Sequence, residues 1–317
     1  MLGYMRFAIG ALPHISQPPS PPQKEPAMSA FTGIWVPLIT PFQNGEVDLP
    51  AAQKIADELI KQGVHGLVVC GTTGEAAALD EAEQSALLSA ISEVAAQRCP
   101  VAMGISGSNT RAVAEKVKRC NRHAPAAYLL SAPSYVRPSQ QGILWHFQAV
   151  AAQTDSPIII YNIPARTGVN IEASTIAALA ADARFVAVKE SSGQVAQIKE
   201  LIADQTLKVL SGDDGLLLST LTLGGHGAIS AAAHIRPDLF VRLYELVKAG
   251  KTEEAALLFN ALLPLIRLLF AEPNPGPLKA ALALQGKLRE TLRLPMTPMS
   301  AAGKAKLAAE LETVMAL

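Results

Sequence analysis

Short apolar runs alternate with amphipathic stretches along the chain from Gly33 onward. The runs have the length of buried strands, and the stretches between them have the period of helices. We predict strands over Ile34–Leu38, Gly66–Cys70, Val101–Gly104, Ala126–Ser131, Pro157–Tyr161, Phe185–Lys189, Lys208–Ser211 and Gly227–Ser230. We predict helices between them over Leu49–Gln62, Asp80–Gln97, Thr110–Arg122, Gln140–Gln153, Ile171–Ala180, Gln194–Asp204 and Asp214–Leu223.

Strands that alternate with helices form βαβ units and a parallel sheet. The number of strands favours an α/β fold of the closed (β/α)8 TIM barrel type. An open doubly wound sheet is the alternative, but it usually has fewer strands and a glycine-rich first turn, which is absent after Leu38. After Ser230 the pattern is purely helical, over Pro237–Ala249, Thr252–Phe270, Pro277–Leu284 and Ala301–Ala316. We therefore expect a barrel core over residues 31–235, and the last barrel helix with a C-terminal helical extension over 236–317.

The first 30 residues differ in composition from the rest. Gln17–Pro22 is rich in proline, and the apolar piece Phe7–Leu12 is too short for a signal peptide. Met28 resembles a natural start. We expect residues 1–30 to be a disordered N-terminal extension.

Composition narrows the function classes. Half of the 317 residues are hydrophobic, and 27 basic side chains balance 27 acidic ones. No basic stripe suggests nucleic acid, and no apolar stretch approaches the roughly 20 residues that span a membrane. The three cysteines have no CxxC spacing, which is typical of reduced thiols in a cytoplasmic protein. The histidines have no metal-ligand spacing, so we expect neither a metal nor a cofactor.

Lys189 is the one charged residue in the predicted strand Phe185–Lys189. In a barrel the active site lies at the carboxyl ends of the strands, where this lysine stands. Burial of an amine favours its uncharged form, which can attack a carbonyl group. The alternative is a structural lysine that forms an ion pair with Glu190 or another acid.

Other strand ends carry further candidate chemistry. The segments are Gly71–Glu75, Ser131–Pro138, Tyr161–Gly168, Ser211–Asp214 and Gly224–Ser230. Each has an ordinary alternative: Tyr161 could pack, Arg166 could be solvated, and Asp213 with Asp214 could cap the next helix. Together they supply an amine nucleophile, a phenolic acid or base, hydroxyl groups and a guanidinium. This set favours imine chemistry on a 2-oxo acid, without a metal.

The motifs Gly71–Glu75, Tyr161–Gly168 and Val188–Glu190 resemble the signatures of the dihydrodipicolinate synthase family, within the superfamily that includes N-acetylneuraminate lyase. Glu272–Pro275 and Leu292–Pro298 are similar to the synthase branch. The resemblance covers about residues 30–317. Arg166 favours the synthase branch over the lyase.

The resemblance implies a (β/α)8 enzyme that condenses pyruvate with L-aspartate 4-semialdehyde. By it, Lys189 forms the imine, and Tyr161, Thr72 and Tyr135 form a proton relay, with Tyr135 donated by a neighbouring subunit of a homotetramer built from two dimers. The implied substrate-binding residues are Thr73, Arg166, Gly212 and Ile229. Ser134 replaces the first tyrosine of the family's usual pair.

Two other functions stay open. One is a pyruvate-dependent aldolase that acts on a sugar-derived aldehyde, and the other is a catalytically silent barrel that binds an oxo acid. The intact relay argues against the silent barrel.

The resemblance also bears on feedback inhibition by L-lysine. The family's lysine-binding positions correspond here to Glu81, Gln84, Val113, Ser134 and Asn109, of which only Asn109 matches. A bound lysine ammonium would lack its glutamate partner, so we expect weak or absent inhibition.

Overall fold

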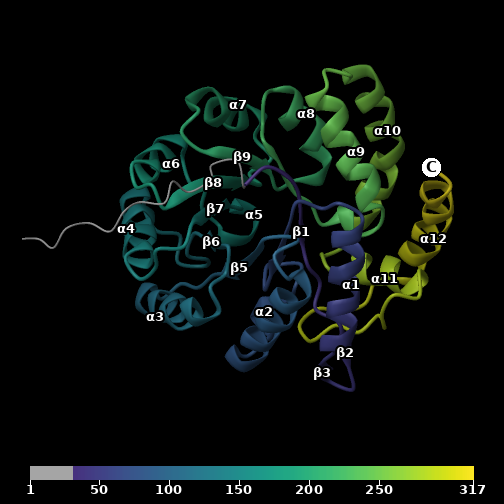
Figure 1. The fold of residues 1–317 in the computed structure, drawn as a ribbon, viewed down its shortest axis with the longest axis horizontal. Coiled ribbons are helices and arrows are strands. Elements are labelled where there is room, and N and C mark those ends of the chain that lie inside the picture. The colour runs from purple at the N-terminus through teal and green to yellow at the C-terminus, as the bar shows by residue number, and fades with distance from the viewer. Residues whose placement is uncertain (1–30) are drawn as a thin grey trace, which may run out of the picture. The chain divides into compact units, whose positions relative to one another are not determined.

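Residues 31–317 are described by the computed structural model, and the predicted N-terminal extension lies outside the described residues. Eight parallel strands close into a barrel in the order β1-β10-β9-β8-β7-β6-β5-β4 (Figure 1). The barrel strands are β1 (Gly33–Pro37), β4 (Gly66–Val69), β5 (Val101–Ile105), β6 (Ala127–Ser131), β7 (Ile158–Asn162), β8 (Phe185–Glu190), β9 (Lys208–Ser211) and β10 (Gly227–Ile229). The predicted (β/α)8 barrel is confirmed, and the open sheet is excluded.

Helices connect successive strands. They are α1 (Leu49–Lys61), α2 (Glu81–Ala95), α3 (Thr110–Cys120), α4 (Gln140–Ala151), α5 (Pro164–Thr167), α6 (Ala173–Ala180), α7 (Val195–Asp204), α8 (Leu217–Thr222) and α9 (Pro237–Lys248). α9 contacts β1 and α8, and so completes the ring. The predicted C-terminal extension consists of α10 (Thr252–Leu269), α11 (Gly276–Leu284) and α12 (Ala301–Met315).

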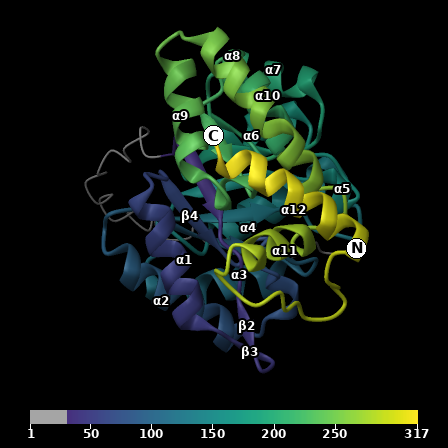
Figure 2. The same ribbon diagram turned by 90° about the vertical axis from the view of Figure 1, so that its right-hand side faces the viewer.

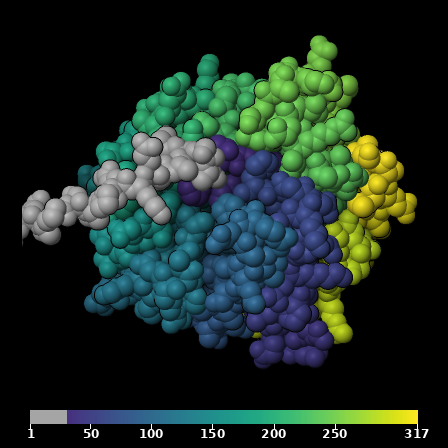
Figure 3. Space-filling view, in the orientation of Figure 1, coloured from purple at the N-terminus to yellow at the C-terminus, as the bar shows by residue number. Residues whose placement is uncertain are grey.

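The C-terminal helices form one packed group beside the end of the ring. α10 contacts α9 and α8, and α12 contacts both α10 and α11. Figure 2 shows α12 alongside these two helices, and the space-filling view shows the yellow C-terminal residues packed against the green surface of α9 and α10 (Figure 3). No helix within residues 31–317 is long and apolar enough to cross a membrane.

The structure differs from the sequence prediction at several elements, and the short helix α5 and the 3-10 turn Ala76–Ala78 were not predicted. A hairpin, β2 (Phe42–Gln43) with β3 (Glu46–Val47), follows β1, and its turn has positive φ at both Asn44 (54°) and Gly45 (87°). Asn-Gly is the preferred dipeptide for such a turn, so the signal was present but lay between very short strands. The helix predicted over Asp214–Leu223 is instead a 3-10 turn, Asp214–Leu216, followed by α8.

Two apolar clusters follow from the alternation of side chains along each strand. Outward-facing residues such as Ile34, Val36 and Leu67 pack beneath the helices. Inward-facing residues fill the barrel, among them Trp35, whose indole is fully buried. Gly66 on the neighbouring strand makes room for it, because a Cβ there would lie 2.1 Å from the ring.

His234 joins the end of β1 to the turn after β10. Its Nε2 accepts a hydrogen bond from the Ile39 N–H (3.3 Å), and its Nδ1 lies 2.8 Å from the Ala231 carbonyl oxygen. These two partners require one protonated and one bare nitrogen, which is the neutral ring. Burial lowers the pKa of His234 to about 4.

We predict that this ring makes the folded protein less stable as the pH decreases from neutral to about 4. Below pH 6.5 the unfolded chain takes up a proton at His234 that the folded chain resists until about pH 4. The free energy of unfolding should therefore decrease by about 3 kcal/mol from this one group as the pH falls through that window. Urea unfolding of the wild type and of His234→Gln, compared between pH 7 and pH 4, measures this contribution.

The comparison with His234→Gln cancels the contributions of other titrating groups to the pH dependence of stability. Asp214 works in the opposite sense, since burial raises the pKa of its carboxyl to about 6 and the folded chain takes up that proton first. Because Asp214 is present in both proteins, its effect cancels. Equal pH dependence of the two proteins would show that His234 does not contribute.

Candidate active site

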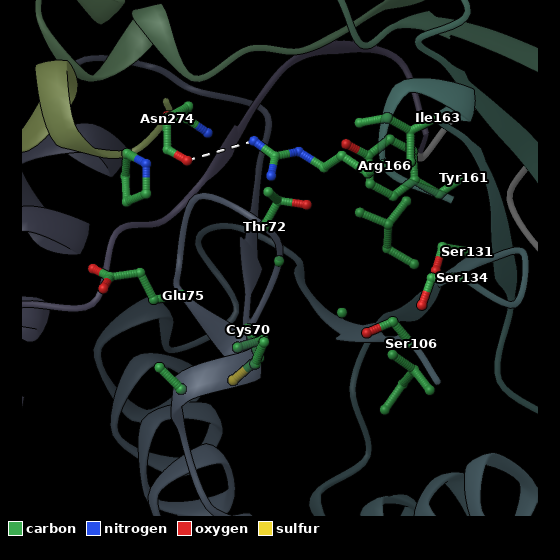
Figure 4. Close-up of a pocket in the computed structure, with 18 of the residues that line it drawn as sticks. Cys70, Thr72, Glu75, Ser106, Ser131, Ser134, Tyr161, Ile163, Arg166 and Asn274 are labelled. Carbon is green, nitrogen blue, oxygen red and sulfur yellow. Dashed lines mark hydrogen bonds between the residues drawn. The ribbon is translucent and has the colours of Figure 1, made fainter. Parts of the chain in front are cut away.

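A cavity of about 300 Å³ opens at the carboxyl ends of the barrel strands. Thr72, Tyr161 and Arg166 line it, together with Asn274 from the turn before α11. Figure 4 shows the Arg166 side chain extending from the Tyr161 and Ile163 side of the cavity towards Asn274. This volume is at the lower end for small-molecule sites and suits a substrate of few atoms.

Lys189 lies next to Tyr161 in the barrel interior. The two residues are register partners on β8 and β7, and both side chains are largely buried. The Lys189 Nζ lies 4.2 Å from the centroid of the Tyr161 ring. Tyr161 lines the cavity, so the amine stands directly behind a cavity wall. A ligand that reaches past this ring would meet a nucleophile and a phenol together.

Glu190 is not the ion-pair partner of Lys189. Successive residues of a strand point to opposite faces, so Glu190 faces the helices while Lys189 faces the interior. The Glu190 carboxylate accepts hydrogen bonds from Asn162 Nδ2 (2.9 Å), Gln197 Nε2 (3.1 Å) and the Ser192 N–H (2.7 Å). Of the structural alternative for Lys189, a pair with Glu190 or another acid, the pair with Glu190 is therefore wrong.

The opposite side of Lys189 is packed against Gly212. A Cβ at Gly212 would lie 3.0 Å from Lys189 Cε and 1.8 Å from Ser191 Oγ, so only glycine leaves space for both side chains. Ile229 belongs to the apolar cluster inside the barrel, one strand further on. Gly212 thus lies against the lysine, Ile229 lies in the barrel interior, and neither lines the cavity.

Two acidic residues after β9 contribute to the electrostatic surroundings of Lys189. Burial raises the pKa of Asp213, and raises that of Asp214 to about 6, while Lys189 lowers both. Asp214 Oδ2 accepts the N–H groups of Ala231 and Ala232, each at 3.2 Å. The expected cap of the next helix is therefore wrong, because Asp214 instead caps the turn after β10.

The loop Gly71–Glu75 has an unusual backbone conformation. Cys70, which precedes the loop, and Glu75, its last residue, have φ of 55° and 52°, which are uncommon values for residues other than glycine. The loop lies close to β5, because a Cβ at Gly104 would be 2.3 Å from the Cys70 carbonyl oxygen. Strained backbone of this kind is frequent at functional loops.

The two threonines of this loop have different surroundings. Thr72 lines the cavity, whereas Thr73 is buried and its Oγ1 accepts a hydrogen bond from Asn274 Nδ2 (3.0 Å). The Asn274 carbonyl oxygen in turn accepts a hydrogen bond from Arg166 Nη2 (3.4 Å), as Figure 4 shows. Asn274 therefore connects the loop Gly71–Glu75 to the Arg166 guanidinium across the cavity.

Tyr135 lies apart from the other predicted site residues. Its side chain is 93% exposed, and it does not line the cavity, although its neighbour Ser134 does. Its φ of 70° and the φ of 47° at Arg137 give this loop left-handed residues other than glycine, as in the loop Gly71–Glu75.

The structure brings Thr72, Tyr161 and Arg166 to one cavity and puts Lys189 behind it. Sequence reasoning missed Asn274, Ser191 and the cavity wall formed by Pro295 and Met296. Asn274 was noted as part of a motif, but it stands 201 residues from Thr73, so only the fold reveals their contact.

Comparison with known proteins agrees with this geometry. The dihydrodipicolinate synthetase family matches residues 30–314. The chain belongs to this family. A 4-hydroxy-tetrahydrodipicolinate synthase from Thermodesulfovibrio yellowstonii is 41% identical over 280 residues, which is 88% of this chain and 96% of the relative. The resemblance inferred from the sequence motifs is therefore confirmed.

Solved structures of dihydrodipicolinate synthases have the same fold. The enzyme from Thermotoga maritima has a TM-score of 0.89 and 33% identity, covering 91% of this chain and all of that chain. The enzyme from Cyanidioschyzon merolae, solved with lysine bound, has a TM-score of 0.88 and 35% identity over 91% of this chain and 99% of that chain. The family likeness thus extends over the entire barrel and the C-terminal helices.

Proposed function

We propose that this chain is a cytoplasmic enzyme that condenses pyruvate with L-aspartate 4-semialdehyde to give 4-hydroxy-tetrahydrodipicolinate, a step in lysine and diaminopimelate biosynthesis. The observation that carries the proposal is the buried amine of Lys189, in register with Tyr161 at the mouth of the barrel. Membership of the dihydrodipicolinate synthetase family and the curated relatives supports it.

Lys189 would act as the nucleophile. Its neutral amine attacks the keto carbon of pyruvate, water leaves, and a protonated imine remains. The imine withdraws electrons, so that a methyl proton departs and an enamine forms. The enamine carbon attacks the aldehyde of the semialdehyde, whose own amine then closes on the imine carbon and releases Lys189.

Each of these steps needs a proton to be moved. Tyr161 and Thr72 both line the cavity, and their hydroxyls would carry protons between the reacting atoms and solvent. Thr73 would hold the pyruvate carboxylate. The backbone around Gly212 and Ile229 would shape the space beside the imine. Removal of one relay member, as in Tyr161→Phe, should lower the rate on the order of 10²–10⁴-fold.

The imine at Lys189 is the first testable consequence. We predict that pyruvate with borohydride adds one reduced pyruvate adduct per chain, and that peptide mass spectrometry finds it at Lys189. Lys189→Ala should show no adduct and no turnover, because no other amine stands at this position. Intact mass unchanged in the wild type would refute the mechanism.

The role of Arg166 is the second testable consequence. Its exposed guanidinium at the cavity can bind a carboxylate with two parallel hydrogen bonds, a geometry that lysine does not reproduce. We predict that Arg166→Ala and Arg166→Lys keep pyruvate trapping but use aspartate semialdehyde on the order of 10–100-fold less efficiently. Comparison of kcat/KM for aspartate semialdehyde with kcat/KM for a sugar-derived aldehyde tests both the role of Arg166 and the class of acceptor. Normal use of aspartate semialdehyde by both variants would contradict the assignment.

The assembly of the enzyme is a further proposal. The 93% exposed ring of Tyr135 would complete the relay only in a neighbouring subunit, within a dimer of dimers. Light scattering with activity measured on dilution tests it: a fully active monomer would contradict the shared relay.

Weak or absent inhibition by L-lysine also stays a prediction, and the structure supplies a reason for it. The Glu81 carboxylate pairs with Arg119 (2.6 Å), and the Gln84 amide donates to the carbonyl oxygens of Ala76 and Leu79. Glu81 already has a cationic partner, and Val113 is buried and apolar, so neither supplies the unpaired carboxylate that a ligand ammonium needs. Steady-state rates with millimolar L-lysine should be unchanged, whereas clear inhibition below that range would overturn the prediction.

A further inference from the structure

Glu75 and Lys279 form an ion pair that is almost completely removed from solvent. Their side chains are 1% and 0% exposed, and Glu75 Oε1 lies 2.5 Å from Lys279 Nζ. Lys279 also donates to the Thr291 carbonyl oxygen (2.8 Å) and stands 4.2 Å from the centroid of the Phe42 ring. Burial lowers the pKa of Lys279, and the Glu75 carboxylate opposes this shift.

The pair joins two distant parts of the chain. Glu75 is the last residue of the loop Gly71–Glu75 (the threonine loop), and Lys279 lies on α11. The second carboxylate oxygen of Glu75 accepts the Arg293 N–H (3.1 Å). The Arg293 guanidinium then donates to Glu83 at 2.6 and 2.7 Å. Residues 273–298 are thus bound by charged groups to the threonine loop and the start of α2.

Residues 273–298 also form part of the cavity wall. Asn274, Pro275, Pro295 and Met296 line the cavity, and so does Glu75 of the pair, whereas Lys279 does not. Within the threonine loop, Thr73 Oγ1 accepts a hydrogen bond from Asn274 Nδ2. The same segment therefore both contacts the threonines and closes the space that Arg166 faces.

We propose that Glu75 and Lys279 are positioning residues, which hold residues 273–298 over the barrel mouth and thereby form the acceptor half of the cavity. Lys189, on the opposite side of Tyr161, has no contact with the pair and forms its imine without it. The inference rests on the proposed function, since it divides that reaction into a step that needs the pair and a step that does not.

A purely structural role is the alternative. A buried pair is often replaceable by neutral side chains of similar size with no loss of stability, whereas removal of one partner leaves an unpaired buried charge. A pair kept only for stability would let any stable replacement retain full activity. A pair that positions the segment would not, because a neutral replacement fills the space without attracting the two elements to each other.

The experiment compares Lys279→Met, Glu75→Gln and the double variant with the wild type. Each single variant should have a lower thermal midpoint, and the double variant should recover most of it. All three should have kcat/KM for aspartate semialdehyde reduced on the order of 10–100-fold, because small displacements of positioning groups cost this much. Borohydride trapping at saturating pyruvate should keep the wild-type rate, because Thr73, which the segment contacts through Asn274, bears on pyruvate binding and not on the Lys189 amine. Hydrogen exchange in residues 290–299 should be faster in all three.

Leu307→Ala is the matched control. Leu307 is fully buried on α12, so its truncation destabilises the C-terminal helices without touching Glu75 or Lys279. It should lower the thermal midpoint and leave the kinetics with both substrates unchanged. The inference is overturned if the double variant recovers acceptor use together with its thermal midpoint, if pyruvate trapping falls in parallel, or if Leu307→Ala loses acceptor use to the same degree.

Failure of the proposed function would look different. Wild-type enzyme that traps pyruvate but ignores aspartate semialdehyde would refute the acceptor, and the same variants would then be compared by hydrogen exchange alone. Faster exchange near the cavity in the double variant, but not in Leu307→Ala, would still support the positioning role. Equal exchange in the two would refute it.

Discussion

Closure of eight parallel strands is the constraint on which the site depends. In a closed parallel barrel all strand ends of one polarity meet at one opening, and the alternation along each strand decides which side chains enter it. Tyr161 and Lys189 are register partners on adjacent strands, so both enter at the same level. A shift of one residue in either strand would send one of them outward to the helices.

The same alternation separates the two charges of Lys189 and Glu190. Glu190 faces outward, where amide and backbone donors from Asn162, Gln197 and Ser192 satisfy its carboxylate. Its charge is therefore engaged away from Lys189. The amine lies beside an aromatic ring and a close glycine, Gly212, and the acidic residues Asp213 and Asp214 interact with it electrostatically from the loop after β9.

The barrel alone does not enclose the cavity. Residues 273–298 supply a wall, and Asn274 links Thr73 with Arg166 across it. The Glu75–Lys279 pair that binds this segment is buried, whereas the other loop around the mouth, with Tyr135, is exposed. One side of the site is thus completed within the chain, and the exposed side is the one that the proposed assembly would cover.

The sequence by itself determined the strand and helix order, because period and length of the apolar runs distinguish buried strands from amphipathic helices. It also determined that Lys189, Tyr161 and Thr72 stand at strand ends, since each directly ends or follows an apolar run. The hairpin after β1 was missed because its strands are too short to show a period. The partner of Glu190, the cap made by Asp214 and the contact of Asn274 with Thr73 were decided only by the tertiary structure. Each of these joins residues whose separation along the chain carries no information about distance, until closure of the barrel and packing of α11 bring them together.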